Sequence, residues 1–300
     1  MAHKNKTNYS PYKARQEARN KALGAKAPVE APKALHGKHK KPESIYSINE
    51  ANDRLADIFR NHGFQCSHEE RMKLAHFYRL LMENQEKENF TRLLKLRDIA
   101  IKHYIDCMIV ADLVDLKFPL MDVGTGPGFP GIPLKIRYPN KKIILAEGVQ
   151  RRVEFLKHVR EEMNLQELDI VGRNINKHFV YPVNGVITRA VEDIRNTLGN
   201  VLNCLQLGGC VYFMKGPGVD PEIPMALKEY GQYYQLKKDI PYSLPETPHQ
   251  RRLVIFEKIK HAPLPEEDEG EELLMDELSG EEKRRWSTFG VTAPKQGGVL

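Results

Sequence analysis

The sequence predicts an α/β fold, in which helices cover both faces of a mostly parallel sheet and a helical subdomain precedes it. From Leu120 onward, short apolar runs alternate with amphipathic helical periods, which is typical of parallel strands joined by helices. Before Pro119, apolar residues recur instead at helical spacing. The last two predicted strands are joined without a long helix, so we expect them to be antiparallel.

The helical subdomain is predicted over residues 46–118. Apolar residues within 74–81 occupy positions i, i+3, i+4 and i+7, which form one face of a helix. Ser67, with Glu70 three residues later, is a capping-box pattern that marks the start of this helix. The same apolar spacing recurs within 101–109 and predicts a further helix.

The second domain, over residues 119–260, is predicted to hold a sheet of seven strands. The strands are expected at 120–123, 142–147, 168–171, 183–188, 210–214, 233–240 and 252–258. Helices are expected at 132–137, 151–163, 192–205 and 222–230, with a turn at Gly208-Gly209.

Charge is unevenly distributed along the 300 residues, whose formal net charge is +6. Residues 1–45 contain 11 Lys or Arg and three acidic residues, whereas residues 261–300 contain ten acidic and four basic ones. Both ends are poor in large apolar residues, so we predict a disordered basic arm and a disordered acidic tail. A basic arm suits nucleic acid, because neutralising phosphates releases counterions.

Several protein classes are disfavoured by composition. No apolar run of about 18 residues is present, and the first ten residues lack a secretory apolar stretch, so we expect no membrane association. The four cysteines are scattered without a Cys-x-x-Cys pair, which argues against a metal site and indicates a reducing compartment. We expect a cytoplasmic protein and a monomer.

A glycine-rich segment at 121–131 (MDVGTGPGFPG) directly follows the first predicted strand. In an open parallel sheet, ligands bind beyond the carboxyl ends of the strands, where the strand order reverses. Glycine lets a ligand approach the backbone closely, as we expect at Gly124 and Gly126. Glu147 ends the next strand, where its carboxylate can accept both hydroxyls of a ribose. The pattern predicts a nucleotide-like ligand.

Two cofactors fit this loop, a dinucleotide and S-adenosylmethionine. The spacing of Gly126, Gly128 and Gly131 matches the dinucleotide pattern, which places a pyrophosphate on a helix N-terminus. Asp122, two residues before Gly124, favours S-adenosylmethionine, because a carboxylate there repels a pyrophosphate and suits the ammonium of a methionine group.

The loop after the fourth strand, residues 187–191, lacks the Asn/Asp-Pro-Pro-aromatic pattern of adenine-amine methyltransferases. Cys204 and Cys210 are placed as core residues rather than as nucleophiles. Arg189, at the strand end, could bind the cofactor carboxylate, a phosphate or a guanine edge. A ring nitrogen with a free lone pair needs no general base, so no catalytic residue is required beyond positioning, for which Arg189 is the candidate.

The segment from about Asn89 to Lys258 resembles the RsmG (GidB) family of 16S rRNA guanine-N7 methyltransferases. The resemblance rests chiefly on residues 122–134 (DVGTGPGFPGIPL). Shorter matches are HYID at 103–106, RRVEFL at 151–156, TRA at 188–190, LGG at 207–209 and MKG at 214–216.

The resemblance implies a class I S-adenosylmethionine-dependent methyltransferase that acts on 16S rRNA or the small ribosomal subunit. Carried over residue by residue, it implies cofactor contacts at Gly124, Phe129, Asn174, Ile175 and Arg189, with Glu147 in place of the usual Asp. Lys215, at a strand end, is a candidate to bind rRNA phosphate.

Two alternatives remain open from the sequence. The same glycines would serve a nicotinamide-dependent oxidoreductase. The family usually has a carboxylate where this chain has Asn174-Ile175, so a non-catalytic ribosome-binding protein on the same fold is the other alternative.

Overall fold

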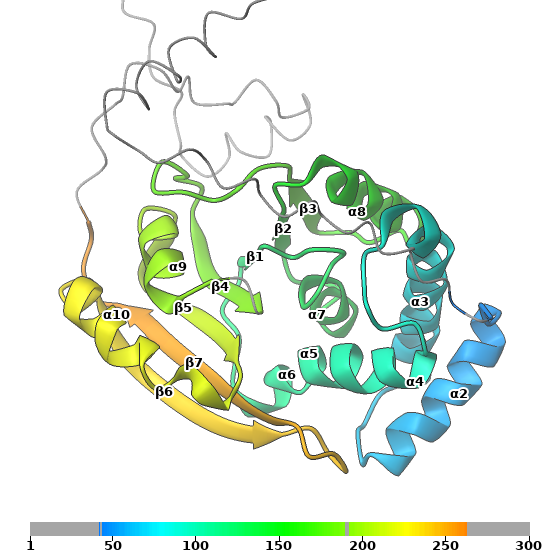
Figure 1. Ribbon diagram of the computed structural model, residues 1–300. Helices are drawn as coiled ribbons and strands as arrows, with labels where there is room; N and C mark the ends of the chain where they lie inside the picture. The colour runs from blue at the N-terminus through cyan, green and yellow to red at the C-terminus, as the bar shows by residue number, and fades with distance from the viewer. Residues whose placement is uncertain (1–41, 43, 190–191, 263–300) are drawn as a thin grey trace, which may run out of the picture. The chain divides into compact units, whose positions relative to one another are not determined.

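The structure is a computed structural model that describes residues 42, 44–189 and 192–262 (Figure 1). The predicted basic arm and acidic tail lie almost wholly outside the described residues. Within the described residues, no helix combines the length and the apolar character needed to cross a bilayer.

Helices come first in the described chain, as predicted. Helix α2 (Ile48–Asn61) and helix α3 (His68–Glu88) both begin with a capping box, and the one at Ser67 is the one predicted. The helices that follow are α4 (Leu96–Ile99), the π-helical turn η1 (Ala100–Ile105), α5 (Asp106–Met108) and α6 (Val110–Leu113). A π-helical turn shifts the side-chain register by one residue and is frequent at functional sites.

A seven-stranded sheet follows, with the order β3-β2-β1-β4-β5-β7-β6. Its strands are β1 (Leu120–Val123), β2 (Ile143–Ala146), β3 (Leu168–Val171), β4 (Val183–Arg189), β5 (Leu205–Lys215), β6 (Tyr234–Ser243) and β7 (Gln250–Lys258). Strand β7 lies between β5 and β6 and is antiparallel to both, whereas the strands from β3 to β5 are parallel. The strand order reverses at β1, so a ligand site is expected between β1 and β4.

Successive strand residues face two separate apolar cores, because side chains alternate along a strand. Leu120 packs with the N-terminal helices, with α7 (Gly131–Arg137) and with α8 (Gln150–Glu162). Met121 packs with α9 (Ile194–Asn200) and α10 (Glu222–Tyr230), which Figure 1 shows beside β4, β5 and β6. Burial on both faces explains the continuous apolar runs in the sequence of the parallel strands.

The predictions over residues 192–210 are wrong in two respects. Helix α9 ends at Asn200, and Gly208-Gly209 lie inside β5 rather than in a turn. The pairing of β5 with β4 shifts between Val183 and Gly185, as at a bulge, and Gly208 has a φ of 73° there. The glycines therefore mark an irregularity within a strand here. Sequence rules for turns do not distinguish such a bulge from a turn, because both use glycine.

Candidate functional site

A cavity of about 530 Å³ lies at the carboxyl ends of β1, β4 and β5. Its lining comes from the glycine loop, the helical segment before the sheet, the strand ends and the start of β7: Phe90, Thr91, Arg92, Leu93, Lys102, His103, Asp106, Gly124, Thr125, Gly126, Pro127, Phe129, Arg189, Met214, Lys215, Gly216 and Arg251. Five of the predicted site residues line this cavity, namely Gly124, Gly126, Phe129, Arg189 and Lys215.

The glycine loop is held closed by Asp122 at the end of β1. Oδ2 of Asp122 accepts hydrogen bonds from Thr125 Oγ1 at 2.6 Å and from the Gly131 main-chain nitrogen at 2.7 Å. A Cβ at Gly131 would overlap the Leu145 side chain, so only glycine allows this closure. The carboxylate thus fixes both ends of a loop whose open side faces the cavity.

Asp122 itself is fully buried and does not line the cavity, although we predicted that it contacts the cofactor. Its Oδ1 atom has no hydrogen-bond partner among the described residues. Burial raises the pKa of Asp122 to about 7, against the lowering effect of the bonds from Thr125 and Gly131. In this structure the Asp122 side chain therefore holds the loop through its bonds to Thr125 and Gly131, on the side away from the cavity.

Glu147 joins the end of β2 to the same loop. Its Oε2 accepts a hydrogen bond from the Gly126 main-chain nitrogen, and its Oε1 accepts one from Val149, both at 2.9 Å. Nη1 of Arg152 lies 3.5 Å from Oε2. Glu147 is buried and does not line the cavity, but each carboxylate oxygen has more than one lone pair, which leaves acceptor capacity beyond the bonds that hold the loop.

Asn174 and Ile175 follow β3 and do not line the cavity. Ile175 is buried in the apolar core that includes α9 and α10. The Asn174 side chain lies against Gly148, because a Cβ at Gly148 would overlap it. The structure therefore places this predicted pair beside the Glu147-Gly148 segment.

Arg189 ends β4 and is held by three acceptors. Its Nη1 donates to the Lys102 carbonyl at 3.1 Å and to Asp106 Oδ2 at 3.3 Å, and its Nη2 donates to His103 Nδ1 at 3.0 Å. The guanidinium carbon is also 5.4 Å from the centre of the Phe129 ring. A guanidinium has five N–H donors, so two remain for a ligand.

The π-helical turn η1 places these acceptors. The Asp106 main-chain N–H bonds to the carbonyls of Ile101 and His103, while the Lys102 carbonyl accepts from Arg189. The sequence predicted a helix here but not its π register. In the sequence, the only sign that this segment has a role was the match of HYID at 103–106 to the family.

His103 is neutral near pH 7, because burial and then the Arg189 charge lower its pKa to about 3. Since arginine only donates, the Nδ1 of His103 must accept, and the ring proton is on Nε2. Nε2 lies 3.3 Å from Thr91 Oγ1, to which it donates. The ring is also stacked on Phe129, with centroids 4.3 Å apart.

Asp106 contacts three side chains, of which only Arg189 was among the residues predicted for the site. Besides Arg189, it faces Arg251 Nε at 3.5 Å and accepts a hydrogen bond from the Tyr242 hydroxyl at 3.3 Å. Arg251 and Tyr242 were missed, because β7 and β6 come close to Asp106, more than 130 residues earlier in the chain, only in the folded protein. No local pattern in the sequence marks them.

Lys215 lines the cavity, but its amine is already bound. Nζ donates to the Glu192 carbonyl at 2.6 Å and to Glu222 Oε2 at 2.8 Å.

The structure also accounts for Cys204, whose thiol is buried with a pKa raised to about 12 by that burial. A protonated, enclosed thiol cannot act as the nucleophile of a cytosine methyltransferase. Among the described residues, no group of three His, Cys, Asp or Glu side chains could hold a metal.

Comparison with known proteins gives one consistent family. Residues 70–254 match the model of the GidB family, described as rRNA small subunit methyltransferase G. The chain is 74% identical over 254 residues to Ribosomal RNA small subunit methyltransferase G 2 of Bdellovibrio bacteriovorus, which covers 84% of this chain and 100% of that protein.

Two further relatives agree. A protein of the same name from Syntrophobacter fumaroxidans is 41% identical over 69% of this chain and 42% of its own length. Ribosomal RNA small subunit methyltransferase G of Carboxydothermus hydrogenoformans is 34% identical over 70% of this chain and 92% of its own length. The chain belongs to the GidB family of rRNA small subunit methyltransferases.

Proposed function

We propose that this chain transfers a methyl group from S-adenosylmethionine to N7 of a guanine in small-subunit (16S) rRNA. The single observation that carries the proposal is the cavity at the β1–β4 switch point, walled by a closed glycine loop to which Glu147 is joined. Family membership supports the same activity. The antiparallel β7 also favours it over an oxidoreductase, because the dinucleotide-binding sheet has the order 3-2-1-4-5-6 and is mostly parallel.

The loop and its surroundings fit S-adenosylmethionine. A Cβ at Gly126 would meet open space, so the backbone on this side is accessible to a ligand. Gly124 and Gly126 would approach the cofactor with their backbone, Glu147 would accept its ribose hydroxyls, and Asn174 and Ile175 would border its adenine. Asp122 would act through the shape of the loop. When bound, the cofactor supplies a methyl group on a positively charged sulfur.

The other residues of the cavity would hold the acceptor. Guanine N7 has a free lone pair, so the site needs no group to remove a proton from the attacking atom. His103 is neutral and holds Arg189, whose two remaining N–H groups can bind a guanine edge or a phosphate. The basic side chains of the lining outnumber Asp106, which suits a polyanionic substrate. The main contribution of the enzyme is then orientation of the two reactants.

The decisive experiment combines binding with product mapping. Calorimetry should show that S-adenosylhomocysteine binds and that NAD does not. Incubation with methyl-labelled S-adenosylmethionine and small-subunit RNA, followed by nuclease digestion and mass spectrometry, should yield 7-methylguanine. Binding of NAD alone would support the oxidoreductase, and RNA binding without label would support the non-catalytic ribosome-binding protein.

We also propose that the protein is cytoplasmic, which cell fractionation would test, and that it is a monomer, which light scattering would test.

A further inference from the structure

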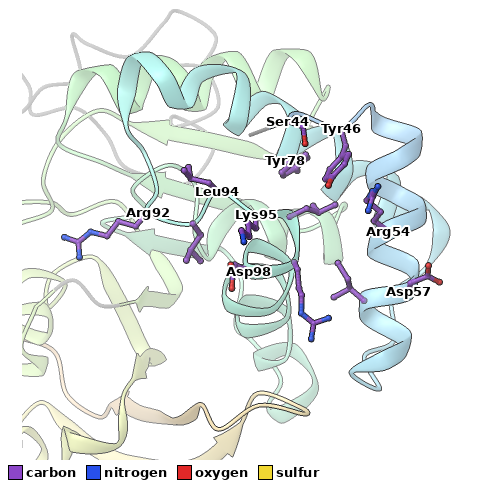
Figure 2. A pocket seen from close by; sticks show the side chains of 13 residues that line it. Ser44, Tyr46, Arg54, Asp57, Tyr78, Arg92, Leu94, Lys95 and Asp98 are labelled. Carbon is purple, nitrogen blue, oxygen red and sulfur yellow. The ribbon is translucent and has the colours of Figure 1, made fainter. Parts of the chain in front are cut away.

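A second cavity, of about 970 Å³, lies between α2 and the segment 92–98 (Figure 2). It is lined by Ser44, Tyr46, Arg54, Asp57, Ile58, Tyr78, Arg92, Leu93, Leu94, Lys95, Leu96, Arg97 and Asp98. Arg92 and Leu93 line both this cavity and the one beside the glycine loop, so the two spaces adjoin. The volume is within the range of ligand sites, about 300–1,000 Å³.

The basic residues of this second cavity are free to bind an anion. Arg92, Lys95 and Arg97 are exposed, and none forms an ion pair with any residue of the described ranges. In Figure 2, the Arg92 side chain extends away from the other labelled residues. Three cations along one short segment, starting at the shared wall, form a track that suits successive phosphates.

The two acidic residues of the lining do not neutralise these cations. Asp57 pairs with Arg60 at 3.0 Å, and Asp98 pairs with Lys102 at 3.2 Å. Neither Arg60 nor Lys102 lines the second cavity, so each acid is compensated from outside it. The lining of the second cavity therefore carries an excess of positive charge.

Planar groups form the opposite wall. The Arg54 guanidinium carbon lies 4.2 Å from the centre of the Tyr46 ring, and the Tyr46 and Tyr78 rings stack with centroids 6.3 Å apart and an angle of 27°. Figure 2 shows Tyr46 between the other two. Aromatic rings and guanidinium planes are the surfaces on which proteins stack unpaired RNA bases.

We propose that this second cavity binds the single-stranded rRNA segment next to the target guanine, with phosphates on Arg92, Lys95 and Arg97 and a base against the exposed Arg54 guanidinium, which stacks on Tyr46. This inference rests on the proposed function. An acidic protein segment would satisfy the cations equally well, but it would not use the planar wall. Continuity with the first cavity through Arg92 and Leu93 further favours the strand that carries the substrate base.

The charge track is tested by the double variant Lys95→Glu/Arg97→Glu in the full chain. Its matched control is Lys228→Glu/Lys238→Glu, which makes the same charge change at exposed residues on α10 and β6. The KM for 16S rRNA should rise about tenfold or more in the first variant and change by less than about twofold in the control. The slope of log affinity against log salt should fall by about 1.4 if two phosphate contacts are lost. Both kcat and the Kd for S-adenosylhomocysteine should be unchanged.

The stacking wall is tested by Tyr46→Ala and Tyr46→Phe. Affinity for RNA should fall about tenfold with alanine and be retained with phenylalanine, since the ring and not the hydroxyl holds the Arg54 plane against which the base stacks. Thermal denaturation of both variants checks that the fold is intact. An RNA affinity and salt slope equal to those of the wild type in the charge variant would overturn the proposal. So would weakened binding of assembled small subunits with unchanged binding of protein-free rRNA, which indicates a protein partner. If the wild-type chain methylates no RNA, the proposed function itself has failed, and that result is distinct from these.

Discussion

Arg189 and Asp106 form an ion pair, with Nη1 of Arg189 3.3 Å from Oδ2 of Asp106, although 83 residues separate them in the chain. The pair joins the end of β4 to the helical segment that precedes the sheet. Both side chains are mostly buried, and both line the cavity beside the glycine loop. The helical part of the chain is therefore part of the site and not only a support for the sheet.

Replacing Arg189 by lysine should reduce kcat/KM by about 100-fold, the cost of a small misplacement in a site that works by orientation. A lysine amine cannot hold the Lys102 carbonyl, Asp106 and His103 in the geometry of the planar guanidinium. Steady-state kinetics with saturating cofactor would measure this. Arg195→Lys is the matched control, because among the residues that the structure describes the one ion pair of Arg195 is with neighbouring Asp193. Equal activity of the wild type and Arg189→Lys would exclude a role for the planar group.

Gly131→Ala should destabilise the fold by about 1–3 kcal/mol, because the added methyl overpacks the site against Leu145. The new atom would also lie 2.8 Å from Asp122 Oδ2 and disturb the bond that closes the loop. Gly218→Ala is the control, since nothing lies within 4 Å of its Cβ. Denaturant unfolding of both variants gives the comparison, and equal midpoints would show that the loop accommodates the methyl without strain.

The buried carboxyl of Asp122 should make stability depend on pH. Its pKa rises from 3.8 to about 7 on folding, so the folded state keeps a proton that the unfolded state has lost between these values. The free energy of unfolding should therefore fall as the pH rises from about 4 to 7, by at most about 1.4 kcal/mol per pH unit from this group. In Asp122→Asn this contribution disappears. Urea unfolding at several pH values measures the difference, and parallel curves for the two proteins would contradict it.

Much of the fold was predictable because its signals are local. The capping box at Ser67 and the apolar runs of the parallel strands are patterns of near neighbours, and the structure confirms them. Gly208 misled because a glycine with positive φ serves a bulge as well as a turn. Which of the two it serves depends on the pairing with β4, which no local window contains.

The sequence predicted only those residues of the candidate site that lie next to a recognisable strand or motif. The glycine loop and Glu147 are close in sequence to the strands that position them, and the structure joins them. The contacts of Asp106 with Arg251 and Tyr242 span most of the domain and arise from tertiary folding. The cofactor contacts of Asn174 and Ile175 remain predictions, because they came from the resemblance and neither residue lines the cavity.

Glu147 gives the sharpest test of how the cofactor is held. If its carboxylate accepts ribose hydroxyls, Glu147→Ala should weaken binding of S-adenosylhomocysteine by about tenfold or more, because charged hydrogen bonds contribute about 1.5–3 kcal/mol. Asn174→Ala should weaken it by less than about threefold, since its uncharged side chain lies against Gly148.

A lost loop contact could also weaken binding in Glu147→Ala, because Glu147 accepts a hydrogen bond from Gly126. The 2′-deoxy analogue of S-adenosylhomocysteine separates the two causes. Loss of the 2′-hydroxyl should weaken binding to the wild type and have little effect on binding to Glu147→Ala, as a double-mutant cycle requires for directly interacting groups. Calorimetric titration of both ligands into both proteins completes the cycle. Equal losses in the two proteins would mean that Glu147 acts on the loop alone and that the ribose is held by another group.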